Sequence, residues 1–346
     1  MSNEQRATSG YYVLKQKLKS NKYTYHLIFR PLRFIKRIVF RTFCTFYWLP
    51  YLIYAEARNF LYHDVIFAQC WVTFSGYVIK HNNWGDDINK YFLEYATGKK
   101  LALIPCDQTL FNVKHYSLIG SIVSFYNLNQ TTIYGSGIMT ATDEIKGRPE
   151  KIISVRGPLT RNALIEKGIE CPENYGDPAL LLPMFYKPDI KQNNTVLIIP
   201  NRDTLMYYDY GNRIIDEMQN KYGCSLVNMF NYDKWTDIVD AIASSKFVMS
   251  ESLHGLIVAE TYGVPCLWVE FMDHARYYEY NSDWLFKFRD FYNSIDKFDM
   301  QAVKLYEGYN FGELMKLKDS WQPGKIDFEK LLSLFPFDIK PEFNKS

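Results

Sequence analysis

A histidine near the start of a predicted helix has the setting that most favours chemistry in this chain. Residues 247–249 form a short apolar run typical of a buried strand, and a helical pattern follows over residues 253–261. Ser252 can cap that helix, which places His254 in its first turn. Helix starts attract anions and disfavour protonation of an imidazole. The segment therefore predicts an anion site with His254, poised near neutrality, as its proton-handling group; the alternative is a strand–helix turn whose histidine only packs.

Three arginines that follow predicted strands are candidates for binding a phosphate or a carboxylate, because guanidinium groups form charge-assisted hydrogen bonds with such anions. Arg156 comes directly after an apolar run, Arg161 lies five residues further along the next helix, and Arg202 follows the strand of residues 195–199. Because ligands of α/β proteins lie at the carboxyl ends of strands, we expect Arg156 to point toward the ligand. The alternative for Arg156 and Arg161 is a structural ion pair, with Asp177 as a candidate partner. The backbone groups expected to join the arginines are those of Ser252, Leu253 and Gly255.

A pair of acidic residues, Asp86 and Asp87, opens a helix predicted through residue 95. A carboxylate there could bind or deprotonate a ligand hydroxyl, and the alternative for one of the two is helix N-capping. We expect no metal ion, because an isolated Asp-Asp pair is a weak metal signature and no histidine or cysteine set has metal-ligand spacing. The turn that contains Gly135 and Ser136 could let the backbone approach a ligand closely. Glu251, next to the predicted helix start of His254, is expected to cap its turn.

Short apolar runs alternate with helical patterns after the first 55 residues, which is typical of βαβ units and parallel sheets. Strands are expected at 71–79, 101–104, 132–134, 152–155, 195–199, 225–229, 247–249 and 266–269. Helices are expected at 86–95, 158–167, 213–221, 235–242 and 253–261. Residues 183–194, with two prolines and a run of amide side chains, are the best domain boundary. The pattern predicts an α/β fold of two Rossmann-like domains that face a cleft.

The N-terminal segment differs from the rest of the chain in charge. Residues 1–41 hold ten Lys or Arg against one acid, Glu4, so this segment carries +9 while the remaining 305 residues sum to −7. Residues 42–55 then form an uncharged, aromatic run that is too short to span a bilayer. This combination favours docking of residues 1–55 at an anionic membrane surface, and the alternative is a basic helix packed on its own domain. Nucleic acid is not expected as a partner, because the body of the chain is acidic.

The six cysteines are scattered and include no CxxC pair, which favours reduced thiols and therefore a cytoplasmic protein. The basic and aromatic N-terminal arm adds the expectation of a peripheral position at the inner face of the cell membrane.

Several short motifs occur in a fixed order between about residues 77 and 295. They are Asn83-Trp84-Gly85-Asp86-Asp87-Ile88-Asn89, Tyr134-Gly135-Ser136-Gly137, Arg156-Gly157-Pro158-Leu159-Thr160-Arg161, Gly176-Asp177-Pro178-Ala179-Leu180-Leu181, Ser250-Glu251-Ser252-Leu253-His254-Gly255 and Phe286-Lys287-Phe288-Arg289-Asp290-Phe291. Together and in this order they resemble the polysaccharide pyruvyl transferases. The first 60 residues and those past 300 lie outside the resemblance.

The resemblance implies a GT-B-like fold and transfer of the enolpyruvyl unit of phosphoenolpyruvate to two hydroxyls of a sugar, which forms a cyclic ketal and releases phosphate. Phosphoenolpyruvate is then a co-substrate, and no other cofactor is expected. The acceptor would belong to a surface polysaccharide or to its lipid-linked precursor. One departure is Ser252, where some family members have an arginine that is associated with donor binding.

We predict four parts in the chain. We expect the basic, aromatic arm over residues 1–55 and an acceptor-side Rossmann-like domain over residues 56–188. A donor-side Rossmann-like domain over residues 189–320 and a C-terminal tail over residues 321–346 follow.

Two other functions compete with this one. Glu260 and the following Gly263-Val264-Pro265 are similar to residues near the donor ribose of GT-B-type glycosyltransferases, so a nucleotide-sugar donor is the alternative. A non-catalytic carbohydrate-binding protein at the membrane is the third. The expected convergence of Arg156, His254 and Asp86 at strand ends argues against it.

Overall fold

The computed structural model of the chain describes residues 30–70, 73–75, 78–80, 83–104, 113–274 and 283–343. The chain forms two compact units, one of Met1–Tyr54 with Asp107–Phe111 and one of Ala55–Cys106 with Asn112–Ser346. Every candidate site residue lies in the second unit. The four-part division of the chain, and the GT-B-like arrangement with its interdomain cleft, remain predictions.

The first sheet of the second unit has five parallel strands in the order β4-β1-β5-β6-β7. Its strands are β1 (Val65–Gln69), β4 (Lys100–Ile104), β5 (His115–Ser117), β6 (Thr131–Tyr134) and β7 (Lys151–Ser154). All five residues of β1 are buried, as expected of a parallel strand covered on both faces. The single strand predicted at residues 71–79 is wrong: β2 (Thr73–Ser75) and β3 (Val78–Lys80) form a separate antiparallel pair there.

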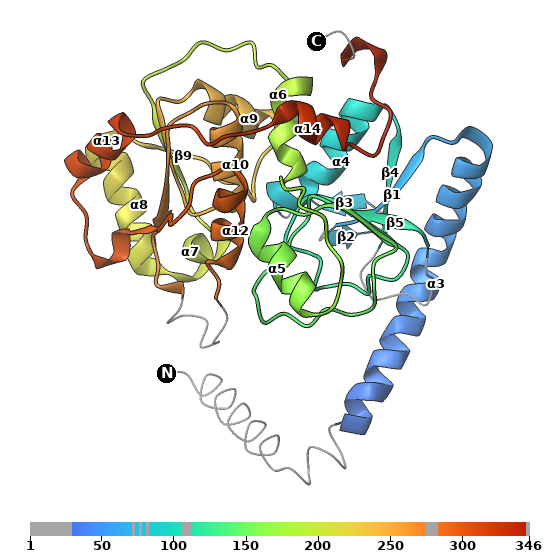
Figure 1. Ribbon diagram of the computed structural model, residues 1–346. Helices are drawn as coiled ribbons and strands as arrows, with labels where there is room; N and C mark the ends of the chain where they lie inside the picture. Colours follow the sequence, from blue (N-terminus) through green and yellow to red (C-terminus); the bar gives the residue numbers. More distant parts are fainter. Residues whose placement is uncertain are drawn as a thin grey trace. The chain divides into compact units, whose positions relative to one another are not determined.

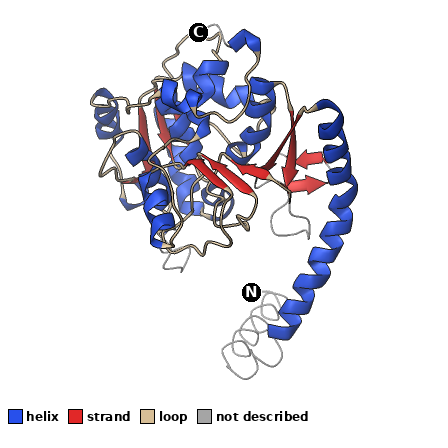
Figure 2. Cartoon of the chain, turned by 45° about the vertical axis from the view of Figure 1, so that its right-hand side comes forward, coloured by secondary structure: helices blue, strands red, loops and turns tan. Residues whose placement is uncertain are grey.

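The second sheet also has five parallel strands, in the order β12-β11-β10-β8-β9. Its strands are β8 (Val196–Ile199), β9 (Ser225–Leu226), β10 (Phe247–Ser250), β11 (Cys266–Glu270) and β12 (Val303–Lys304). Figure 2 shows the strands of both sheets in red among the helices. The predicted α/β class is confirmed, and β8, β10 and β11 lie close to their predicted positions.

The helices of the second unit follow the periodicity of the sequence, and Figure 1 labels them. They include α4 (Trp84–Thr97), α5 (Pro158–Glu166), α7 (Arg202–Tyr207), α8 (Asp209–Tyr222), α9 (Trp235–Ser244), α10 (Leu253–Thr261), α12 (Phe286–Ser294), α13 (Phe311–Asp319) and α14 (Phe328–Ser333). On α9 the side chains of Ile238, Val239 and Ile242 are buried, as their spacing predicts. Every residue of α10 is buried. Helix α10 is therefore a central core helix, which holds its first turn rigidly.

Two long-range contacts fix the start of α4 beside the second half of the chain. Trp84 is fully buried, and its backbone amide donates to the carbonyl of Met229 at 2.8 Å. Its indole Nε1 donates to the carbonyl of Trp235, also at 2.8 Å. Because the indole is buried and both N–H groups of Trp84, on the backbone and on the ring, are hydrogen-bonded, the first turn of α4 has little freedom.

The C-terminal segment packs on elements of the first sheet. The hydroxyl of Tyr134 on β6 donates to the carbonyl of Leu331 on α14 at 2.8 Å. The ring of Phe335 contacts those of Phe92, Tyr134 and Phe185. Residues 321–343 therefore pack against the core, and Leu331 is buried in it.

Helix α3 (Arg30–Tyr62) contains the aromatic run of residues 42–55, with Pro50 inside it. The part of the chain before residue 30, which carries half of the basic residues of the predicted arm, lies outside the described residues. Among the described residues no helix, α3 included, has an apolar run long enough to cross a membrane.

Candidate active site

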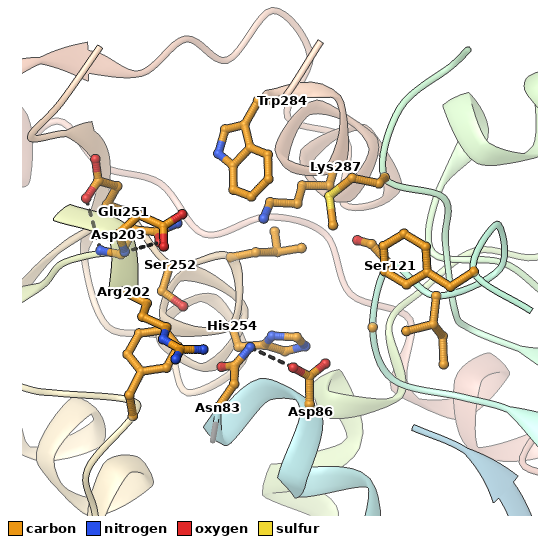
Figure 3. A pocket seen from close by; sticks show the side chains of 17 residues that line it. Asn83, Asp86, Ser121, Arg202, Asp203, Glu251, Ser252, His254, Trp284 and Lys287 are labelled. Atoms are coloured by element: carbon orange, nitrogen blue, oxygen red, sulfur yellow. Dashed lines mark hydrogen bonds between the residues drawn. The ribbon is translucent and has the colours of Figure 1, made fainter. Parts of the chain in front are cut away.

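A pocket of about 400 Å³ lies among loops and first helical turns that neighbour the strands of both sheets (Figure 3). Its walls include the first turns of α4 and α10, the loop after β8 and the start of α12. The charged and titratable side chains that line it are Asp86, Arg202, Asp203, Glu251, His254 and Lys287. The pocket therefore combines cations, carboxyl groups and an imidazole within one small space.

His254 lies in the first turn of α10, as the sequence predicts, and is only 8% exposed. Ser252 occupies the N-cap position, but its side chain makes no capping bond; the Ser250 hydroxyl accepts from the Ser252 amide at 3.0 Å instead. Burial lowers the pKa of His254 to about 3, and the charges of Lys287 and Arg156 add to this effect. The imidazole is therefore neutral near pH 7. The expectation of a group poised near neutrality is wrong, because burial and two cations act together.

The close approach of α4 to α10 depends on Gly85. A Cβ atom at this position would overlap the imidazole Nδ1 of His254. Only glycine allows the backbone of α4 to lie against the ring, and this contact fixes the orientation of the imidazole.

We expect Gly85→Ala to destabilise the protein by about 1–3 kcal/mol, because the added methyl group must displace a buried ring or a helix. Urea unfolding measures this change. Gly312→Ala on α13 is the matched control, because its Cβ would meet only the Asn310 side chain at 3.2 Å. Equal unfolding free energies for the two variants would contradict the tight contact between Gly85 and His254.

A buried carboxyl group lies behind the imidazole. The Nε2 atom of His254 is 3.9 Å from Oδ2 of Asp177, and neither atom has a hydrogen-bond partner in the described part of the chain. The other carboxyl oxygen of Asp177 accepts from the Ala179 amide at 2.9 Å, at the start of a 3₁₀ turn (Pro178–Leu181). Burial raises the pKa of Asp177 to about 7, although the Ala179 bond and the charge of Arg156 oppose the shift. A small movement would allow a direct hydrogen bond between Asp177 and the imidazole.

Asp86 lies in the first turn of α4 and lines the pocket. Asn83 caps this helix by accepting from the Gly85 amide, and its side-chain amide donates to Asp86 Oδ2 at 2.8 Å. Burial raises the pKa of Asp86 to about 7, against the opposing effect of the Asn83 bond. A substantial share of the protein therefore carries a proton on Asp86 at neutral pH, which suits a general acid.

Lys287, on the first turn of α12, is a pocket residue that sequence reasoning did not assign. Its ammonium group lies 4.0 Å from the ring centroid of Trp284, and in Figure 3 it points into the pocket. Burial lowers the pKa of Lys287 to about 8, with a further contribution from the charge of Arg156 and an opposing one from Asp86. The group is still mostly cationic near pH 7, and a bound anion would hold its proton more firmly.

Part of the chain that lines this pocket is similar to a known protein family. Residues 107–274 match the family model of the polysaccharide pyruvyl transferases. This match assigns a polysaccharide pyruvyl transferase domain to residues 107–274. Protein L143 of Acanthamoeba polyphaga mimivirus, described as uncharacterized, is 29% identical over 215 residues, which cover 60% of this chain and 72% of that protein.

The pyruvyl transferase match contains His254, Glu251 and Arg202 but not the whole pocket. Asp86 precedes residue 107 and Lys287 follows residue 274, so both lie outside the matched segment. Their position in the pocket with His254 is seen in the structure and does not follow from the family match.

Arg156 does not line the pocket, contrary to the expectation that it would point toward the ligand. Its side chain is fully buried, and its Nε atom donates to Asp290 Oδ2 at 3.0 Å. Further bonds run from the guanidinium to the carbonyl of Ile138 and to the hydroxyl of Ser121. Asp290 also accepts from the amide and hydroxyl of Thr160, at 2.9 and 2.6 Å. Arg156 therefore joins α12 to α5, and it reaches the pocket only through Ser121 and through its charge.

The other two predicted arginines differ from each other in position. Arg161 pairs with Glu173 at 3.1 Å and donates to the carbonyl of Cys171, and it does not line the pocket. Arg202, the first residue of α7, does line it. One of the three predicted arginines is thus placed where it could contact a bound anion.

Four other predicted site residues also lie away from the pocket wall. Asp87 is buried and accepts from the hydroxyl of Tyr232 at 2.7 Å. Gly135 has φ of +80°, and its backbone packs so closely on Pro178 that a Cβ would overlap the proline ring. The hydroxyl of the buried Ser136 pairs with that of Ser117, and Gly255 lies beyond the lining residues of α10. Close packing, rather than ligand contact, accounts for these positions.

Ser252 and Leu253 do line the pocket, together with Glu251, which was expected to cap the turn. The buried carboxylate of Glu251 accepts from the amides of Asn201 and Phe271, at 3.0 and 2.9 Å, and from the hydroxyl of Thr204. It also pairs with His274 Nε2 at 2.9 Å. Glu251 therefore ties together the loops that follow β8, β10 and β11, and so positions one wall of the pocket.

Glu260, the residue that favoured a nucleotide-sugar donor, is a structural residue in this domain. Its buried carboxylate pairs with Lys297 and accepts from the Gly324 amide at 3.0 Å. It is not among the pocket residues. The feature that favoured a glycosyltransferase thus has a different role, which is to attach the C-terminal segment to α10.

Proposed function

We propose that this protein transfers the enolpyruvyl unit of phosphoenolpyruvate to two hydroxyls of a sugar, with formation of a cyclic ketal and release of phosphate. The proposal rests on one observation above all: Lys287, His254 and Asp86 face the same pocket in a chain with a polysaccharide pyruvyl transferase domain. Their charge states at neutral pH are those of a cation, a base and an acid.

The pocket suits a small molecule with two anionic groups. Phosphoenolpyruvate carries a phosphate and a carboxylate, so its site needs a cationic donor and oriented amides. Lys287 supplies the charge, and the first turn of α10 supplies amides at the positive end of the helix dipole. Arg202 lines the same pocket and would meet the second anionic group.

The reaction that follows balances without an added oxidant or metal. A proton is added to the methylene carbon of phosphoenolpyruvate, which becomes a methyl group and leaves an oxocarbenium-like centre at the neighbouring carbon. One sugar hydroxyl attacks this carbon and loses its proton. The bond between the carbon and the phosphate oxygen then breaks, the second hydroxyl attacks, and its proton leaves with the phosphate. The two protons released by the sugar hydroxyls thus balance the two that are taken up, one by the methyl group and one by the phosphate.

Asp86 and His254 divide the proton transfers. Asp86, whose carboxyl holds a proton near neutral pH, delivers it to the methylene carbon as general acid. The neutral imidazole of His254 accepts the proton of the attacking hydroxyl. Once protonated, His254 has Asp177 3.9 Å away as a counter-ion, which would stabilise the imidazolium. No metal ion or further cofactor takes part in this scheme.

The family implies a polysaccharide acceptor. We propose that the acceptor sugar is carried on a membrane lipid and that the enzyme works in the cytoplasm at the inner face of the membrane, held there through residues 1–55. The donor lies against the second half of the chain and the acceptor against the first, on the side of Asp86.

A phosphate-release assay with phosphoenolpyruvate and a panel of sugars tests this function, with thermal shifts measured in parallel. We expect phosphoenolpyruvate to raise the unfolding temperature and His254→Ala to abolish phosphate release. A thermal shift with nucleotide sugars alone, and none with phosphoenolpyruvate, would replace the proposal by a glycosyltransferase activity.

A further inference from the structure

Helix α3 carries a continuous stripe of exposed, large apolar side chains, which we call the α3 stripe. Its members are Ile35, Ile38, Val39, Phe43, Phe46, Ile53 and Tyr54, and their side chains are between 49% and 70% exposed. Successive members are three, four or seven residues apart, or adjacent, so at 3.6 residues per turn they fall on one side of the helix. A soluble protein rarely exposes so many large apolar side chains in one stripe without a partner.

The opposite side of the helix is different. Trp48 and Leu52, from the aromatic run of the sequence, are each only 5% exposed. They are therefore not available to a partner, and the exposed surface is narrower than the aromatic run alone suggests. The surface that remains begins before that run, at Ile35.

The charge around the stripe indicates which partner it meets. Residues 5–55 contain no acidic residue, and residues 1–41 carry +9. Five of these cations, Arg30, Arg33, Lys36, Arg37 and Arg41, belong to the sequence of α3 itself. A second copy of this chain would bring two such segments together and would be opposed by charge repulsion. An anionic lipid surface instead neutralises them while it covers the apolar side chains.

We infer that the α3 stripe inserts into the headgroup and upper acyl region of an anionic bilayer, with α3 lying along the membrane surface. An amphipathic helix with apolar residues on one side and basic residues near it binds membranes in this way, without crossing them. The α3 stripe is thus the surface through which the protein would bind the membrane. Only the benefit of this binding, access to a lipid-linked acceptor, rests on the proposed function. The binding itself requires no catalysis.

Vesicle co-sedimentation of the full-length protein tests the inference. We expect binding to vesicles of phosphatidylcholine mixed with phosphatidylglycerol, and much weaker binding to phosphatidylcholine alone or at high salt. The variant with Phe43→Glu and Phe46→Glu, which places two charges in the stripe, should bind anionic vesicles at least about tenfold more weakly.

A matched variant controls for the added charges. Phe298→Glu with Leu317→Glu makes the same kind of change at exposed positions of the second unit, and it should bind anionic vesicles like the parent. Both variants should keep the parent's phosphate release with a soluble acceptor. If the parent releases no phosphate yet binds vesicles, the proposed function fails while the stripe assignment stands.

Three results would overturn the inference. These are undiminished vesicle binding by the Phe43→Glu, Phe46→Glu variant, equal weakening in the control variant, and equal binding of the parent to neutral vesicles. Light scattering without vesicles adds a fourth: a stable dimer that the stripe variant converts to a monomer would assign the stripe to a second copy of the chain.

Discussion

Replacing Lys287 with methionine should lower kcat/KM for phosphoenolpyruvate by about 30- to 4,000-fold, because truncating one side of a buried charge pair typically costs about 2–5 kcal/mol. The methionine keeps most of the volume beside Trp284 but removes one of the two cations that line the pocket. Initial rates of phosphate release over a range of phosphoenolpyruvate concentrations measure the effect. Most of the loss should appear as a higher KM, since the ammonium group binds the ground state as well as the transition state.

Two variants sharpen this test. Lys287→Arg should recover part of the loss, because it restores the charge but changes its position. Lys325→Met, at a surface ion pair with Asp296 outside the pocket, should leave the kinetics unchanged. An unaltered KM in Lys287→Met would remove this lysine from the donor site.

The pH dependence gives a separate test of the same group. The free protein loses the Lys287 proton as the pH rises through about 8 and the Asp86 proton as it rises through about 7. Both losses lower kcat/KM, so on the alkaline side the parent's log(kcat/KM) should fall with a slope that corresponds to the loss of two protons. The Lys287→Arg variant keeps its charge at these pH values, so its slope should correspond to the loss of one proton.

The position of His254 could be predicted because all of its determinants are local. The apolar run of β10, the cap position of Ser252 and the apolar pattern of α10 lie within fifteen residues, and β10 and α10 form where these signals place them. The protonation state of His254 could not be predicted. Its pKa is lowered first by burial and then by the charges of Lys287 and Arg156, which are distant in sequence and come close only in the folded chain.

The same distinction explains the two main failures. Arg156 stands at a strand end, but its partner Asp290 is 134 residues away, and no local signal shows that the pair is buried. Lys287 lies between two aromatic residues of a short helix, a sequence that also fits an ordinary surface lysine. Its only sequence signal was its place within one of the motifs of the family resemblance. Local pattern therefore predicted elements and their ends, whereas the pairing between distant charged residues decided which of them reach the pocket.

Replacing Asp86 with asparagine should lower kcat by about 10²–10⁴-fold, the usual contribution of a general acid. Asparagine has nearly the shape of aspartate, but it cannot deliver a proton to the methylene carbon. Single-turnover phosphate release at saturating phosphoenolpyruvate measures the chemical step apart from binding. An unchanged rate would show that another group supplies the proton.

The pH dependence of stability distinguishes a catalytic role of Asp86 from a structural one. The folded-state pKa of Asp86, about 7, lies above the ordinary value of 3.8, so the unfolded chain holds fewer protons on this group between these two values. The contribution of Asp86 to stability is therefore present below pH 3.8 and lost as the pH rises through about 7. An asparagine side chain does not ionise and carries no such penalty, so at pH 8 the Asp86→Asn variant should be at least as stable as the parent.

Asp87→Asn is the contrasting variant on the same helix turn. Its carboxylate is buried and accepts from Tyr232, away from the pocket, so its replacement should lower the unfolding temperature and leave kcat nearly unchanged. Thermal unfolding and single-turnover rates of both variants at pH 8 make the comparison. A protein that is stable but slow with Asp86→Asn, and less stable but active with Asp87→Asn, would assign the acid to Asp86; the reverse result would assign it to Asp87.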